Sequence, residues 1–184
     1  MSDETARPSV ADERAAAQAR QREQRIRRKA EMAVRYEDGR PGSWILIASW
    51  VGTAVFAVTA ILAATVRYDA DLEPPGDVFA ATVALVIFGI GCVLFLAALV
   101  LGAQRSRDAE MSVGGWFFLS GVAPKPVRWH LMGSLAVEVV VALGTAAARP
   151  YSTLAFGILV PVYGLALAGI WGARHGVYPP RTSP

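Results

Sequence analysis

The sequence predicts an all-α membrane protein, with four antiparallel transmembrane helices preceded by a charged cytoplasmic helix. Two observations predict this class. The 184 residues are 54% hydrophobic, and the apolar residues gather in four long runs with almost no charge, as in membrane spans. Of the eighteen Lys and Arg residues, ten precede Pro41, so the polar region before the first run is strongly basic.

Residues 1–42 form the predicted cytoplasmic charged tail. Its opening mixes acids and bases without an apolar core, which is unlike a secretory signal peptide. Residues from about 12 to 36 are almost all strong helix formers, with Asp12 as the expected N-cap. Ile26 is the one large apolar residue of a weak stripe, so this helix buries little surface. Two interpretations of this helix remain open. It is either a solvated helix near anionic lipid headgroups or a docking helix for a protein partner.

The four-helix transmembrane domain is predicted over residues 43–173. Its first two spans, 43–66 and 78–103, are uncharged, and Trp44 is the expected interface anchor of the first. The connection 67–77 carries four acids. Because it contains a Pro-Pro-Gly turn and lacks the spacing of a calcium loop, we expect a solvated acidic loop.

A longer connection, 104–129, contains the segment 112–123, SVGGWFFLSGVA. Twelve residues are too few to span a bilayer as a helix. We expect this segment to lie in the membrane interface or against the bundle, with Trp116 in its apolar centre as an interface anchor. Arg128 and Trp129 are the expected anchors at the start of the third span.

The third and fourth spans are predicted at 130–148 and 151–173. Only Arg149 and Pro150 separate them, so the two helices must be antiparallel neighbours. Pro161 is expected to kink the fourth span and to free a carbonyl near Gly157. Small residues at helix spacing predict close helix contacts, and the expected packing positions are Gly52, Gly157, Gly164 and Gly172.

The charge distribution predicts the threading. With four spans, the N-terminal tail, the 104–129 connection and the 174–184 tail share one side and hold sixteen Lys and Arg residues, against two on the other side. The positive-inside rule therefore predicts a multi-pass protein of the cytoplasmic (inner) cell membrane with both termini in the cytoplasm.

Glu138 is the one acid inside a predicted span, near the middle of 130–148. A charged carboxylate at that depth is unfavourable, so we expect it to be neutral or paired inside the bundle. Thr145 lies on the same helix face two turns away, and Tyr163 belongs to the neighbouring span. Thr53, Thr59 and the carbonyl freed in the fourth span are further possible partners. The side chain either fixes helix register, passes protons or cations, or contacts a lipid or partner helix.

Motifs for enzyme chemistry are missing from the sequence. It has no glycine-rich phosphate loop, no HExxH motif and no nucleophile elbow. A single cysteine excludes an intrachain disulfide, and the two histidines have no acid or cysteine at ligand spacing. We therefore expect no catalytic residues, no cofactor and no metal. Arginines interleaved with glutamates, without an aromatic platform, argue against nucleic-acid binding.

The C-terminal stretch 168–181, AGIWGARHGVYPPR, together with a charged tail and four spans, resembles uncharacterised four-span membrane proteins of actinobacteria. That resemblance implies no activity, cofactor or site residue. The expected function is non-enzymatic: an accessory or scaffold subunit of a larger membrane assembly, in contact with the lipid bilayer and with other subunits or further copies of itself. The alternative is a small proton-linked transporter or channel-like oligomer that uses Glu138.

Overall fold

The structure, a computed structural model, describes residues 10–36, 41–65 and 75–181. Predictions that concern residues 1–9, 37–40, 66–74 and 182–184 lie outside this part. The elements are α1 (Val10–Arg35), α2 (Ser43–Thr65), α3 (Pro75–Arg105), α4 (Val113–Trp116), α5 (Lys125–Ala148), the 3-10 helix η1 (Thr153–Leu159) and α6 (Pro161–His175). The described chain is all-helical, and four stretches are long and apolar enough to cross a membrane. These two predictions are confirmed.

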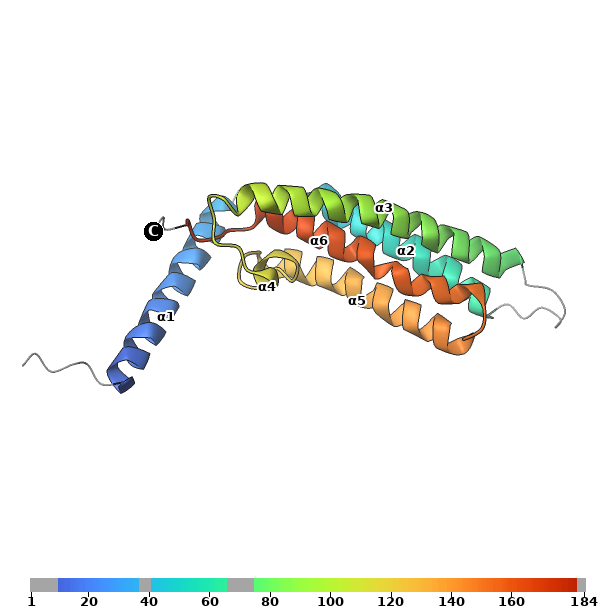
Figure 1. The fold of residues 1–184 in the computed structure, drawn as a ribbon, viewed down its shortest axis with the longest axis horizontal. Helices are drawn as coiled ribbons and strands as arrows, with labels where there is room; N and C mark the ends of the chain where they lie inside the picture. The colour runs from blue at the N-terminus through green and yellow to red at the C-terminus, as the bar shows by residue number, and fades with distance from the viewer. Residues whose placement is uncertain (1–9, 37–40, 66–74, 182–184) are drawn as a thin grey trace, which may run out of the picture.

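The four long apolar stretches lie side by side and form one elongated bundle (Figure 1). α1 projects from the end of the bundle that also carries α4 and the C-terminal end of α6. α6 makes its largest contact with α3, and Thr153–His175 is buried to a greater extent than the other three stretches. The fourth stretch is thus the central one. The other three pack around it, and their outer faces are apolar and exposed.

The cores of the helices follow the predicted spans, but several ends differ. α5 begins at Lys125, earlier than predicted, with Pro124 at its N-cap and Pro126 in its first turn. Proline fits there because the first N–H groups of a helix have no acceptor within the helix. α1 begins at Val10, so Asp12 lies inside the first turn and the prediction that it caps the helix was wrong.

Pro161 separates two kinds of helix. Residues Thr153–Leu159 form a 3-10 helix and the α-helix starts at Pro161 itself. The N–H of Val160 donates to the carbonyl of Gly157 at 3.1 Å. That carbonyl is therefore already bonded, and the prediction of a freed carbonyl near Gly157 was wrong. The tighter i to i+3 pattern of the 3-10 helix supplies the missing donor.

Asp77 corrects the expectation of a wholly solvated acidic connection. It lies in the first turn of α3 and is only 2% exposed. Its carboxylate forms an ion pair with Arg149, the C-cap residue of α5, at 3.1 Å. The two residues join the helix ends at the far end of the bundle from α1 (Figure 1).

Candidate functional site

Two facing polar pairs run along the contact between α2 and α5. Ser49 and Thr53 are four residues apart on α2, and Ser134 and Glu138 are four apart on α5, so each pair lies on one helix face. All four side chains are at most 2% exposed. The hydroxyls of Ser49 and Ser134 form one hydrogen bond between the helices, and Thr53 and Glu138 form the other.

Glu138 is fully buried and is bonded through Thr53. The Thr53 hydroxyl oxygen lies 2.8 Å from Oε1 of Glu138 and 2.9 Å from the carbonyl oxygen of Ser49. A hydroxyl has only one hydrogen to donate, so an ionised Glu138 would compete with that carbonyl for it. If Thr53 donates to Ser49, a neutral Glu138 can donate to Thr53 and both contacts are satisfied. The geometry thus suits the neutral acid.

The second carboxyl oxygen of Glu138 faces α6. A Cβ atom at Gly164 would lie 2.5 Å from Oε2, so the absence of a side chain there makes room for the carboxyl group. Oε2 is buried against the backbone of Gly164, and no side chain within 10–36, 41–65 and 75–181 forms a hydrogen bond with it. Glu138 therefore touches α2 by a hydrogen bond and α6 by close packing.

The other residues expected at this site bond elsewhere. Tyr163 donates from its hydroxyl to the carbonyl of Ala48 at 2.8 Å, which links α6 to α2 beside the Thr53 contact. Thr145 and Thr59 donate only to carbonyls of their own helices among the hydrogen bonds that the structure describes. Of the partners that sequence reasoning left open, Thr53 is the one that bonds Glu138.

The four glycines expected to pack helices each face another element. A side chain at Gly52 would overlap the ring of Tyr163, and one at Gly172 would overlap the backbone oxygen of Trp116. Gly157 lies against Phe56, with a Cβ position 3.1 Å from the ring. Together with Gly164, these positions let α6 and η1 approach their neighbours closely.

The expected interface anchors divide into two groups. Trp44 and Trp129 are 53% and 78% exposed and point away from the core. Arg128 is also exposed and borders a pocket beside α1. Trp116, in contrast, packs inward: its indole N–H donates to the carbonyl of Gly169 at 2.9 Å. It fills space beside Gly102 on α3, so it is a packing residue and not an exposed anchor.

Sequence reasoning missed the buried contacts of the C-terminal stretch. Trp171 is fully buried, and its indole N–H donates to the carbonyl of Pro41 at 3.0 Å. The hydroxyl of Tyr36 donates to the carbonyl of His175 at 2.6 Å. Downstream, the N–H of Val177 donates to the carbonyl of Val122. The stretch 168–181 is therefore packed against both the start of α2 and the α4–α5 segment.

The described residues contain no group of three side chains able to hold a metal ion. The polar contact between α2 and α5 holds the carboxyl group of Glu138 among hydroxyl neighbours, an arrangement that can hold one proton and fix the register of three helices. Comparison of the chain with family models, curated proteins and solved structures finds no match.

Proposed function

We propose that the protein is a non-enzymatic accessory or scaffold subunit of a larger membrane assembly. The observation that carries this proposal is that Glu138 contacts two neighbouring helices. Its carboxyl group is fully buried, bonds Thr53 of α2 and packs on Gly164 of α6, so the interior acid holds three helices in register. A bundle fixed in this way suits a rigid part that presents its outer surfaces to partners.

The outer surfaces available for such contacts are extensive and apolar. α3 exposes large side chains along its length: Val78, Phe79, Leu85, Val86, Ile90, Val93, Leu96 and Val100. Lipid covers such a face in a membrane, and another helix can replace the lipid through close packing. α1 adds a charged surface that projects beyond the bundle (Figure 1).

The proposal includes a location and a topology. We propose that the chain lies in the inner cell membrane, with four spans that alternate in direction and both termini in the cytoplasm. The support is the excess of Lys and Arg in the N-terminal tail, the α3–α5 connection and the C-terminal tail. Kinship with the actinobacterial four-span proteins is part of the same proposal and rests on residues 168–181.

A second candidate function is proton-linked transport through an oligomer. One observation favours it: Oε2 of Glu138 is buried without a side-chain hydrogen-bond partner in the described part of the chain. An unpartnered carboxyl oxygen is a place where a proton or cation can bind. The scaffold role is preferred because the other polar side chains around Glu138 are hydrogen-bonded between or within helices: Ser49, Thr53, Ser134, Thr145 and Tyr163.

Purification of the tagged full chain from native membranes in a mild detergent tests the proposal. The scaffold role predicts a complex with other proteins at fixed stoichiometry, measured by mass. A lone homo-oligomer that conducts protons in proteoliposomes would favour the second candidate and defeat the first. A variant lacking residues 1–34 keeps Tyr36, and the removed side chains that the structure describes, from Val10 on, are mostly exposed, so the bundle should stay folded. Loss of the complex in this variant would place the docking surface on α1.

A further inference from the structure

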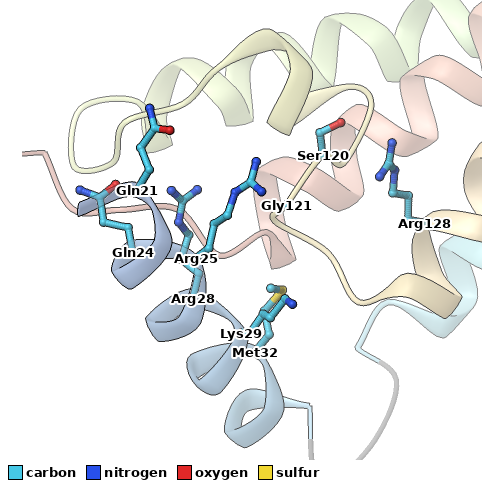
Figure 2. Close-up of a pocket in the computed structure, with 9 residues that line it drawn as sticks. All are labelled: Gln21, Gln24, Arg25, Arg28, Lys29, Met32, Ser120, Gly121 and Arg128. Carbon is cyan, nitrogen blue, oxygen red and sulfur yellow. The ribbon is translucent and has the colours of Figure 1, made fainter. Parts of the chain in front are cut away.

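A pocket lined by several cationic side chains lies between α1 and the segment that leads into α5 (Figure 2). Its volume is about 680 Å³, which is in the range of small-ligand sites. Four cationic side chains line it: Arg25, Arg28 and Lys29 of α1, and Arg128 at the start of α5. No acidic side chain is among its lining residues in the described chain, and no carboxylate there forms an ion pair with these four.

The face of α1 that points to the bundle is polar. The weak apolar stripe noted in the sequence does not face the bundle. Ile26, the large residue of that stripe, is 70% exposed. Among the α1 side chains that the structure describes, only Arg28 and Met32 are partly buried. Figure 2 shows Arg25 and Arg28 extending from α1 toward the loop that carries Ser120 and Gly121. α1 is thus positioned to present cations to a shared space rather than to bury apolar surface.

Four like charges around one space repel one another unless an anion occupies it. The neighbouring pocket on the other side of Arg28 provides an internal contrast. There the charges are balanced, because Glu31 and Glu110 line it together with Arg27 and Arg28. Arg28 belongs to both pockets. The pocket bordered by Arg128 adds Arg25, Lys29 and Arg128 without any acidic lining residue in the described chain, so its charge balance calls for an external anion.

We propose that this pocket binds a phosphate group. Guanidinium groups bind phosphate oxygens through paired, charge-assisted hydrogen bonds, and Lys29 and Ser120 supply further donors. Two sources share this chemistry: the headgroup of an anionic phospholipid and a soluble phosphate compound. The surroundings favour the lipid, because Phe118 and Trp129, close in sequence to the pocket residues, are 49% and 78% exposed. Exposed aromatic side chains of this kind mark the headgroup level of a membrane. This site is independent of the proposed scaffold role.

The test uses the full chain in detergent, with two probes added separately: phosphatidylglycerol, compared with phosphatidylcholine, and inorganic pyrophosphate. The pocket variant is Arg28→Ala/Arg128→Ala. The matched control, Arg14→Ala/Arg22→Ala, removes the same charge from exposed α1 positions that do not line the pocket. Bound lipid is counted by native mass spectrometry, and apparent affinity is taken from the ligand-dependent rise in unfolding temperature.

We expect phosphatidylglycerol, but not phosphatidylcholine, to bind the wild type. Each lost cation should weaken binding about tenfold, while the control variant stays close to wild type. Pyrophosphate binding with the same variant pattern, and no preference between the two lipids, would identify a soluble phosphate compound as the ligand. Equal losses in the pocket and control variants, or no binding of any probe by the wild type, would overturn the proposal.

Discussion

The carboxylate of Asp77 and the guanidinium of Arg149 form an ion pair at 3.1 Å that joins the start of α3 to the end of α5. The Asp77 side chain is 3% exposed and that of Arg149 is 23% exposed. Because the Asp77 carboxylate has left nearly all of its water, it depends on the guanidinium of Arg149 for charge compensation. This pair closes the end of the bundle opposite α1.

Arg149→Met should destabilise the protein strongly, because it leaves the Asp77 carboxylate buried without its ion-pair partner. The expected loss in the free energy of unfolding is about 3 kcal/mol. Asp77→Leu/Arg149→Met removes both charges and should recover most of that loss. Unfolding in mixed detergent micelles measures all variants. The single variant Asp77→Leu completes the cycle. If the losses of the two single variants simply add in the double variant, the residues do not compensate each other.

The spans could be predicted from the sequence because an apolar run of about twenty residues is a local property. The Asp77–Arg149 pair could not, since its members are 72 residues apart. Their meeting depends on which helix ends lie together. Trp116 was misjudged for a similar reason. An aromatic residue in a short segment suits the membrane interface equally well, until Gly102 and Gly169 of other helices provide a place for its ring.

The interior acid could be identified from the sequence because a lone carboxylate inside a span is rare. Its partner could not, since Thr53 and Thr59 both lie on α2. A signal was nevertheless present. Ser49 and Thr53 repeat at the same spacing of four as Ser134 and Glu138, and matched polar pairs on two helices favour facing contacts.

Gly164→Ala should destabilise the bundle because its new methyl group would meet Oε2 of Glu138 at 2.5 Å. Overpacking of this kind costs about 1–3 kcal/mol. Gly144→Ala is the matched control, since a Cβ there meets nothing within 4 Å and the change should be neutral or slightly stabilising. In a Glu138→Ala background the clash disappears, so the cost of Gly164→Ala should fall. An unchanged cost would show that the two residues are not in contact.

Alkaline pH should weaken the packing of the C-terminal stretch through Tyr178. Burial raises the pKa of Tyr178 from 10.0 to about 12; Arg105 opposes this rise and Tyr36 adds to it. Between these values the unfolded chain loses the phenol proton while the folded chain keeps it, so the free energy of unfolding falls as pH rises. Its contribution is complete below pH 10 and is lost through about pH 12.

Tyr178→Phe should therefore make the alkaline loss of stability shallower. The change should have little effect at neutral pH, because the buried hydroxyl has no hydrogen-bond partner in the described chain. Tyr151→Phe is the control, since Tyr151 is fully exposed. Thermal unfolding measured across the alkaline range tests this prediction. If stability falls with pH equally steeply in the wild type and in Tyr178→Phe, Tyr178 is not the group responsible.

The proposed topology predicts opposite labelling of the two ends of the bundle. Single cysteines replace Ser106, at the end near α1, or Tyr151, at the other end, in a Cys92→Ala background. The cysteine at position 151 should react with a membrane-impermeant reagent in intact cells, and the one at position 106 only after the membrane is opened. The reverse pattern, or equal labelling, would overturn the threading.

Glu138 separates the two candidate functions. Glu138→Gln keeps a donor for Thr53 and a group of the same shape against Gly164, so stability should change by less than about 1 kcal/mol. Glu138→Leu removes a buried polar group, and Thr53 still donates to the carbonyl of Ser49 at 2.9 Å. That variant should be tolerated or slightly stabilising. Thermal unfolding of the wild type and both variants in detergent measures these effects.

Proton flux into proteoliposomes completes the comparison. Neither glutamine nor leucine can exchange a proton, so a transport role requires flux in the wild type and none in either variant, with all three proteins folded. If Glu138 only fixes helix register, neither the wild type nor either variant should conduct protons. The complex recovered from membranes should then survive Glu138→Gln. Flux that Glu138→Gln abolishes in a fully folded protein would show that the carboxyl group carries protons, and the scaffold role would then fail.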